Sequence, residues 1–148
     1  MISCVADRPD LAAMMAPLIR ALLAMETPIL AEHDISMWGY SVLSRLTDGP
    51  VRGQAVLAEA IGADKTRLID VLDELQERGL IRREPDPTDR RARVVAITAA
   101  GSQLRDRVRR AIQHAEQPLL RRLPPEDRVA FLRGLHRLAD HVRGGQSG

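Results

Sequence analysis

The sequence is poor in aromatic residues and in cysteine. Aromatic residues make up 2% of its 148 residues, so a hydrophobic core must be built mainly from Leu, Ile, Val, Ala and Met. The single cysteine, Cys4, excludes an intramolecular disulfide and a cysteine-rich zinc site. Low cysteine usage fits a reducing compartment, so we expect a cytoplasmic protein.

Long apolar runs and a leader sequence are also missing from the pattern. The apolar stretches fall short of the roughly 20 residues that a membrane-spanning helix needs. The short apolar start at Met1–Val5 gives way at once to Asp7 and Arg8, which does not resemble a signal peptide. We therefore expect no signal peptide and no membrane partner.

Neither sign of charge is in large excess. The formal net charge is +2, and because Lys65 is the only lysine, nearly all the positive charge is carried by arginine. Arginine suits planar, two-pronged contacts to phosphates and guanines, although a coding bias explains its abundance equally well. The placement of the charges, rather than their sum, must decide whether the protein binds nucleic acid.

Hydrophobic periodicity predicts a chain that is mainly helical. Apolar residues spaced by three and four predict a first helix over residues 10–30, which Pro17 should kink or divide. Ser36 and Thr98 are well placed as N-caps of later helices. The further predicted helices cover residues 36–46, 53–61, 64–78, 98–119 and 124–142.

The middle of the chain predicts a helix-turn-helix followed by a β-hairpin. The short helices over 53–61 and 64–78 are joined by a turn at Gly62, which is the helix-turn-helix pattern. Leu80–Arg83 and Arg93–Ile97 are predicted strands. Glu84–Arg91 is predicted to be an irregular loop because it contains two prolines and three acids. We expect an α+β fold, with a winged helix-turn-helix and a helical dimerisation region.

The start of the second helix in this motif is the expected DNA-reading element. In a helix-turn-helix the N-terminal part of this helix meets base edges in the major groove. Arg67 can fork onto a guanine, and Thr66 can bond a base or a phosphate. Asp64 can accept a hydrogen bond from cytosine or cap the helix, and we favour the cap. The rest of this helix is acidic and must face solvent or protein, or the helix must enter the groove tip-first; the acids are Asp70, Asp73, Glu74 and Glu77.

Arginines gather at the predicted wing. Asp64–Arg93 holds eight cations and eight anions, so this module is not a basic block. Arg90, Arg91 and Arg93 nevertheless follow directly on the predicted loop, and a loop-borne arginine suits the narrow minor groove. The neutral balance and the acidic helix leave open a second interpretation, in which the winged helix is a protein-interaction module without DNA binding.

From Asp34 to Gly101 the sequence resembles the MarR family of winged-helix regulators. The wing, Asp-Pro-x-Asp-Arg-Arg followed by Thr-x-x-Gly, is the most specific part. The flanking helices fit in number, length and order, so the resemblance covers nearly the whole chain. The matching segments are Ile35–Ser36, Val42–Leu46, Leu57–Gly62, Leu72–Ile81, Asp86–Arg91 and Ile97–Gly101.

The resemblance implies a homodimeric DNA-binding regulator, which we expect to be a repressor. In this family the first, fifth and sixth helices intertwine, and each winged helix reads half of a pseudo-palindromic operator. Asp89 matches a wing aspartate that orients an arginine, and Arg91 matches the arginine that reaches the minor groove. The expected DNA-binding residues are Arg52, Gln54, Asp64, Lys65, Thr66, Arg67, Asp89, Arg90, Arg91 and Arg93.

The terminal regions are expected to make the dimer. We predict a helical dimerisation region over residues 1–34 and 101–148, and a winged helix-turn-helix DNA-binding domain over 35–100. The terminal helices carry more apolar surface than a winged-helix core of about 65 residues needs, and surplus apolar surface usually marks an interface. The expected partners are double-stranded DNA and a second copy of the chain.

Many members of the resembled family also bind a small aromatic or phenolic effector between the two regions. Met14, Leu18, His33, Met37 and Trp38 could line such a pocket, because the indole would suit an aromatic ligand. Ordinary core packing is the alternative interpretation of these residues, and we favour it.

The remaining chemistry of the sequence is sparse. Cys4 lies in the N-terminal tail without a nearby tyrosine, so we do not expect it to sense oxidants. His33, His114, His136 and His141 show no metal spacing. With no nucleophile–base pair and no phosphate loop, we expect no enzymatic activity, no cofactor and no metal.

Overall fold

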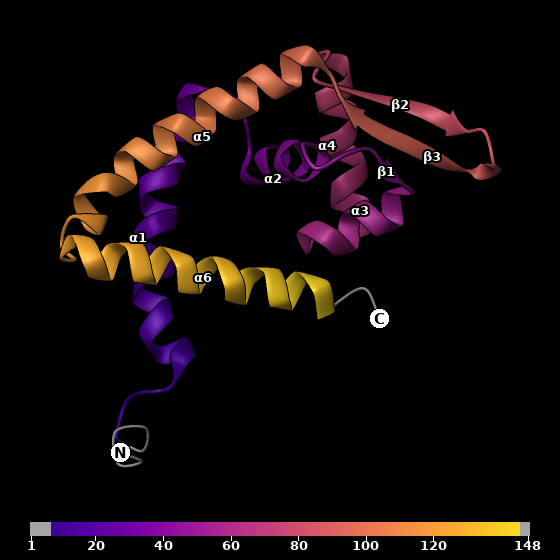
Figure 1. Cartoon of the computed structure of the whole chain (residues 1–148). Helices are drawn as coiled ribbons and strands as arrows, with labels where there is room; N and C mark the ends of the chain where they lie inside the picture. The colour runs from indigo at the N-terminus through magenta and orange to yellow at the C-terminus, as the bar shows by residue number, and fades with distance from the viewer. Residues whose placement is uncertain (1–6, 146–148) are drawn as a thin grey trace. The chain divides into compact units, whose positions relative to one another are not determined.

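The structure is a computed structural model that describes residues 7–145 (Figure 1). Two compact units make up the chain, one ending at Ile112 and the other beginning at Gln113. In order, the described elements are α1 (Leu11–Glu32), α2 (Met37–Leu46), β1 (Val51–Arg52), α3 (Gln54–Ile61), α4 (Lys65–Glu77), β2 (Ile81–Asp86), β3 (Asp89–Ile97), α5 (Ala99–Leu120) and α6 (Pro125–Gly145).

One hydrophobic core holds the first unit together. Its fully buried side chains come from α2, α3, α4, β2, β3 and α5 and include Val42, Leu43, Leu57, Leu72, Ile81, Val95 and Val108. Leu30 of α1 and Leu104 and Ile112 of α5 belong to the same cluster. The winged helix therefore shares its core with parts of both flanking helices. The functional division at residues 34/35 and 100/101 stays a prediction, because this core crosses both boundaries.

Short polar caps fix where the helices begin. Ser36 accepts a hydrogen bond from the Gly39 backbone N–H at 3.0 Å, and Thr98 accepts one from Gly101 at 3.1 Å. Both predicted caps are confirmed. Of the two effects predicted for Pro17, the division of the first helix is wrong, because α1 runs through both Pro17 and Pro28, and the kink stays a prediction. A proline removes one backbone donor, but the hydrogen bonds on either side of it remain.

The wing is part of a three-stranded antiparallel sheet in the order β1-β3-β2. β1 was not predicted, because two residues cannot show an alternating pattern; Val51 pairs with Val95 on β3. The predicted irregular loop over 84–91 is also wrong, since strand pairing continues to the Asp86–Asp89 pair. Pro85 is tolerated because β2 is an edge strand.

The end of the wing contains a bulge. Pro85 pairs with Arg93, yet the neighbouring residue Asp86 pairs with Asp89. β3 therefore has three additional residues here, Arg90–Ala92, opposite a single step of β2. Two of the predicted DNA-binding arginines, Arg90 and Arg91, therefore lie in the segment where the regular ladder is interrupted.

A close backbone contact joins the wing to α5. The Thr98 hydroxyl donates to the Gly79 carbonyl at 2.7 Å, and the Thr98 N–H donates to the Leu80 carbonyl at 3.1 Å. A Cβ atom on Gly101 would lie 2.1 Å from that same Leu80 oxygen. The Thr-x-x-Gly motif is therefore required for packing. The threonine fixes the start of α5 through its hydrogen bonds, and the glycine permits the close approach of α5 to the Leu80 carbonyl.

The second unit contains the end of α5 and all of α6. Arg128 donates from Nε to the Leu120 carbonyl at 3.1 Å and from Nη2 to the Leu123 carbonyl at 3.2 Å, so it caps the end of α5. No described residue of α6 is buried. Its large apolar side chains are 40–62% exposed: Val129, Phe131, Leu132, Leu135, Leu138 and Val142.

Helix α1 is also an exposed apolar helix. By length and composition alone it could cross a membrane, contrary to our expectation, because its charges are too few to interrupt the run. The same test is passed by helices of soluble proteins, so it does not identify a membrane span. Leu30 is its buried residue, whereas the following side chains are 39–56% exposed: Leu11, Met14, Met15, Leu18, Ile19 and Leu23.

We expect Gly101→Ala to lower the free energy of unfolding by about 1–3 kcal/mol, because the added methyl forces α5 away from the Leu80 carbonyl. Urea unfolding followed by circular dichroism measures this change. Gly144→Ala is the matched control, since a Cβ at Gly144 meets no atom within 4 Å. Equal stability of the two variants would contradict the packing argument.

Candidate nucleic-acid interface

The tip of α4 presents three exposed polar side chains in a row. Lys65, Thr66 and Arg67 form the first turn and are all exposed. Asp64 precedes them, and its carboxylate accepts the Arg67 backbone N–H at 2.8 Å. The capping role that we favoured for Asp64 is therefore confirmed. The cap satisfies a free backbone donor and leaves the three side chains accessible.

Arg67 also has two side-chain neighbours. Its Nε lies 3.8 Å from the Asp64 carboxylate, and its guanidinium carbon lies 5.9 Å from the centre of the Trp38 ring. The Arg67 side chain is still 58% exposed. This residue is thus held from two sides while remaining accessible to a ligand.

Arginines pair with two of the four acids on α4. Asp73 accepts from Arg83 at 2.5 Å, and Glu74 forms an ion pair with Arg78 at 3.4 Å. Asp70 and Glu77 are exposed. All four acids are exposed, and two of them are paired with arginines, so they face solvent or protein, which is one of the two arrangements that we expected.

Arg83 connects the wing to the helix-turn-helix. From β2 its guanidinium reaches Asp73 and Gln76 of α4, the latter at 2.6 Å, and Gln54 of α3 at 3.4 Å. The Arg83 side chain is only 14% exposed. Gln54 was expected to contact DNA, and the structure gives it this second role. Sequence reasoning missed Arg83 because its partners lie up to 29 residues away.

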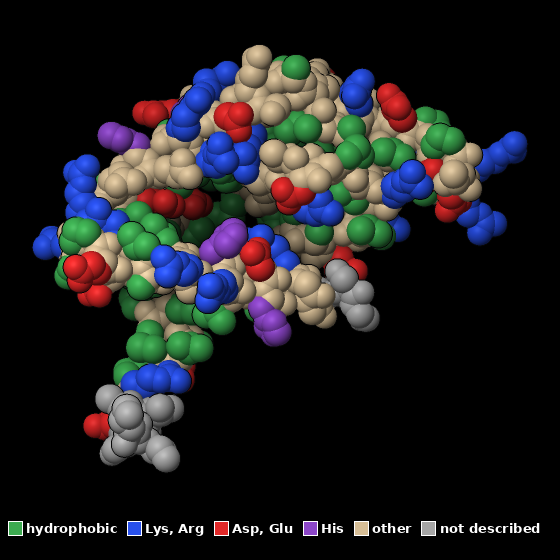
Figure 2. Space-filling view, in the orientation of Figure 1, with side chains coloured by type: hydrophobic (Ala, Val, Ile, Leu, Met, Phe, Trp, Pro, Cys, Tyr) green, Lys and Arg blue, Asp and Glu red, His purple; other side chains and the backbone are tan. Residues whose placement is uncertain are grey.

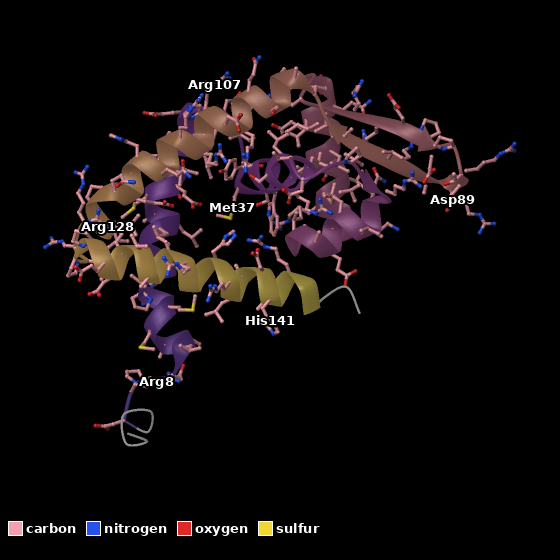
Figure 3. The ribbon with its side chains drawn as sticks, viewed as in Figure 1. Arg8, Met37, Asp89, Arg107, Arg128 and His141 are labelled. Carbon is pink, nitrogen blue, oxygen red and sulfur yellow. The ribbon has the colours of Figure 1, made fainter. Side chains whose placement is uncertain are left out.

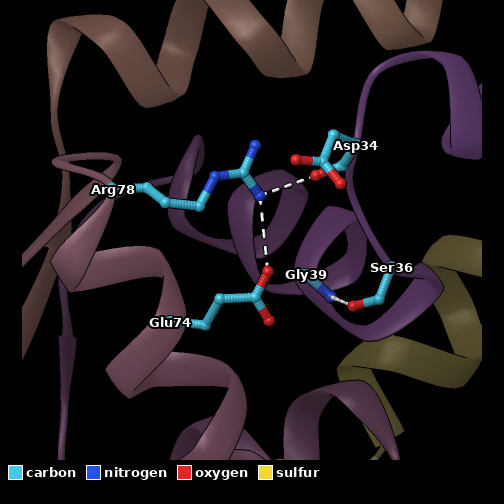
Figure 4. A network of polar contacts seen from close by, with 5 residues as sticks. All are labelled: Asp34, Ser36, Gly39, Glu74 and Arg78. Carbon is cyan, nitrogen blue, oxygen red and sulfur yellow. Dashed lines mark hydrogen bonds and ion pairs between the residues drawn. The ribbon is translucent and has the colours of Figure 1, made fainter.

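Arg78 anchors the other end of α4 (Figure 4). Its Nη1 donates to the Asp34 backbone carbonyl at 2.7 Å and also contacts Glu74. Asp34 joins α1 to α2 and has a φ of 50°, a left-handed conformation that aspartate adopts more readily than most residues. Helix α4, the expected recognition helix of the helix-turn-helix, is thereby tied to the junction between α1 and α2.

The wing turn is organised by a buried carboxylate. Asp86 is 6% exposed and accepts from the Thr88 N–H at 2.9 Å and from the Thr88 hydroxyl at 2.7 Å. These two hydrogen bonds, and then the positive charge of Arg52, hold the pKa of Asp86 below its usual range, although burial opposes them. Arg52, a predicted DNA-binding residue, is exposed on β1, and its charge also favours the ionised form of the Asp86 carboxylate.

Asp89 lies at the end of the wing, and cationic side chains project there (Figures 2 and 3). Its carboxylate accepts the Arg91 backbone N–H at 2.9 Å. The carboxylate thus fixes the backbone of the arginine that it was expected to orient. Arg90, Arg91 and Arg93 are all exposed.

An exposed aliphatic residue on α4 escaped the sequence analysis. Ile69 is 38% exposed, although helical spacing places Leu68 and Leu72 beside it in the core. It lies three residues after Thr66 and four after Lys65, and so on a neighbouring part of the helix surface. Its exposure could have been found from the periodicity, because it lies off the inward-facing stripe.

The structure separates the five predicted effector residues. Met14 and His33 are 19 residues apart, which corresponds to about 28 Å along a helix, so one protomer cannot gather both around a small ligand. His33 Nδ1 donates to the Ile29 carbonyl at 2.8 Å and closes α1. His33, Met37 and Trp38 remain together around the start of α2, whereas Met14 and Leu18 lie earlier on α1 (Figure 3 labels Met37).

Two further sequence expectations concern Cys4 and metal binding. Cys4 lies outside the described residues. Within residues 7–145, no group of three or more His, Cys, Asp or Glu side chains is placed to hold a metal ion.

Comparison with known proteins identifies related sequences. A model of the MarR family matches residues 35–92. Transcriptional regulator HosA from Escherichia coli O111:H- is 32% identical over 99 residues, covering 67% of this chain and 73% of that protein. A Thauera aromatica protein named for regulation of the hcr operon is also 32% identical over 99 residues, covering 67% of this chain. The match spans only 60% of the Thauera protein's length.

Solved structures share the fold. A MarR family transcriptional regulator from Rhodococcus sp. RHA1 is similar with a TM-score of 0.73 at 25% identity, over 89% of this chain and 96% of that one. CouR from Rhodococcus jostii RHA1, bound to p-coumaroyl-CoA, has a TM-score of 0.73 at 24% identity over 95% of each chain. These similarities confirm the predicted fold class, a mainly helical winged helix with a small sheet.

We expect Arg83→Ala to lower the free energy of unfolding by about 1–3 kcal/mol, because it leaves Asp73 and Gln76 without their partner. Wing amides should also exchange hydrogen faster. Urea unfolding and hydrogen exchange measure the two effects. Arg82→Ala is the control, because Arg82 is an exposed neighbour on the same strand. Loss of the same stability in both variants would argue against the Arg83 contacts.

Proposed function

Because this chain belongs to the MarR family of transcriptional regulators, we propose that it is a sequence-specific repressor that binds a pseudo-palindromic DNA operator as a homodimer. One observation carries the proposal: a single compact unit exposes polar and cationic side chains at the tip of α4 and arginines at the end of the wing. These are the two places at which a winged helix meets DNA.

At the tip of α4, each side chain suits a different contact in the major groove. Arg67 can bond the two acceptors of a guanine, and Lys65 can neutralise a phosphate. Thr66 can bond a base or a phosphate. The exposed aliphatic Ile69 suits a thymine methyl group, the apolar feature of the major groove.

At the wing, Arg91 is the residue that we propose to enter the minor groove. Arg90 lies beside it at the tip of the wing. Both belong to the bulge of β3, and Asp89 fixes the Arg91 backbone. A narrow minor groove concentrates negative potential, which favours an inserted guanidinium.

A homodimer is the proposed functional form. The exposed apolar side chains of α1 and α6 form larger unpartnered surfaces than a soluble monomer normally presents. Burying them between two copies also accounts for the apolar character of α1 in a cytoplasmic protein. A two-fold dimer would place two recognition helices roughly 34–36 Å apart, one turn of DNA.

A small aromatic effector is proposed to release the DNA. CouR, which shares the fold, is bound to p-coumaroyl-CoA in its structure. In this chain the proposed contact is the start of α2, where Trp38 offers an aromatic face and Met37 is 43% exposed. The proposed regulator performs no catalysis; its ligand changes the affinity for DNA.

The protein-interaction alternative is supported by the neutral charge balance of residues 64–93 and by the four exposed acids of α4. Salt dependence separates the two functions. A DNA affinity that falls steeply as the salt concentration rises supports phosphate contacts, because cationic side chains that neutralise phosphates displace the counterions of the DNA. Affinity for random DNA pools that is undetectable even at low salt would favour the alternative.

We expect Arg91→Ala to weaken operator binding by about 1–3 kcal/mol at fixed salt, because it removes the wing contact. The operator is first obtained by selection from random DNA, and affinity is measured by fluorescence anisotropy. Arg107→Ala is the matched control, since Arg107 is an exposed arginine on α5, away from the wing (Figure 3). Unchanged affinity of Arg91→Ala would exclude the proposed wing contact.

We expect Leu135→Glu to shift the protein from dimer to monomer, because Leu135 lies in the middle of the exposed apolar stripe of α6. Sedimentation velocity measures the shift. Arg137→Glu introduces the same side chain on the opposite face of the helix and should leave the dimer intact. A monomeric wild-type protein at micromolar concentration would contradict the proposed assembly.

A further inference from the structure

The contact between Trp38 and Arg67 joins α2 to the tip of the recognition helix. The guanidinium carbon lies 5.9 Å from the centre of the indole ring, within the range in which the negative face of an aromatic ring attracts a cation. The two residues are 29 positions apart, so this pairing comes from the packing of α2 against α4. Tryptophan is the most favourable aromatic partner for such a contact.

An exposed arginine without such a partner samples many side-chain conformations. Fixing it on a base costs conformational entropy, which lowers both affinity and discrimination. The Asp64 carboxylate restrains Arg67 only partly, because one of its oxygens already caps α4 and the ion pair is 3.8 Å long. The indole face supplies a second restraint and leaves the guanidinium N–H groups, which lie in the guanidinium plane, free to donate.

The backbone that carries the indole is itself held in place. Trp38 is the second residue of α2, whose start is fixed by the Ser36 cap at 3.0 Å. Two residues before that cap, the Asp34 carbonyl accepts from Arg78 at 2.7 Å. The region around the start of α2 therefore contacts both ends of α4. Asp34 contacts Arg78 at the C-terminal end, and Trp38 contacts Arg67 at the N-terminal end. A ring attached to a backbone fixed in this way can orient the arginine that it contacts.

We propose that Trp38 is a positioning residue for DNA reading: its indole face holds the Arg67 guanidinium in the orientation that reaches the operator, so that a residue of α2 sets base preference at the position read by α4. This inference rests on the proposed function. Trp38 acts through Arg67 and needs no contact of its own with a base.

A double-mutant cycle tests the inference. Trp38→Leu removes the aromatic face, Trp38→Phe keeps a weaker one, and each is made with Arg67 and with Arg67→Ala. We expect Trp38→Leu to weaken operator affinity about two- to fivefold and to broaden preference at the base pair that Arg67→Ala affects. Trp38→Phe should retain most of both. In the Arg67→Ala background, Trp38→Leu should have no further effect.

A merely structural Trp38 gives a different pattern. Trp38→Leu would then lower affinity by the same factor with or without Arg67, and that result would overturn the inference. An unchanged affinity and selection profile in Trp38→Leu would overturn it as well. Thermal unfolding identifies a variant that fails to fold; if Trp38→Leu does, Trp38→Met takes its place in the cycle, because methionine also lacks an aromatic face.

Tryptophan fluorescence gives a second test that needs no DNA. Trp38 is the only tryptophan, so the emission of the whole protein reports on this ring. Arg67→Ala should change the emission, whereas Lys65→Ala, the matched loss of a cation from the same turn, should not. No response to Arg67→Ala would overturn the contact.

A wild-type protein that selects no DNA sequence would overturn the proposed function and the reading role of Trp38 together. If the wild-type protein selects a sequence and Trp38→Leu selects the same one, only this inference is overturned.

Discussion

The pairing of the partly buried Arg83 guanidinium with α3 and α4 is the interaction on which the proposed DNA-binding surface depends. It leaves the edge strand of the wing and meets Asp73 and Gln76 on α4 and Gln54 on α3. A charge that is only 14% exposed is costly without partners, so the wing has one favourable position relative to the two helices. The two cationic tips are consequently parts of one body.

This arrangement explains how a chain with a net charge of only +2 can present cations where DNA would meet them. Arg83 and Arg78 pair with acids on α4 and act as internal anchors. Lys65, Arg67, Arg90 and Arg91 are left exposed at the two tips. Arg78 also ties the C-terminal end of α4 to the α1–α2 junction, and Arg67 at the other end of α4 contacts Trp38.

The isolated chain leaves α1 and α6 with extensive exposed apolar surface. Only Leu30 of α1 is buried, and no described residue of α6 is. Removing this apolar surface from water lowers the free energy of the assembly. A second copy of the chain is therefore the proposed partner.

The sequence by itself determined the features that depend on neighbouring residues. Ser36, Asp64 and Thr98 cap helices because each carries an oxygen that can reach the backbone three residues on. The helical spacing of apolar residues predicted the elements that share the core. Tertiary structure decided what depends on distant partners. β1 exists only because β3 lies beside it, and pairing across the wing overrides the loop signal of Pro85 and Asp86. The pairings of Arg83 with Asp73 and of Arg67 with Trp38 form only when separate helices and strands pack, and no local pattern records them.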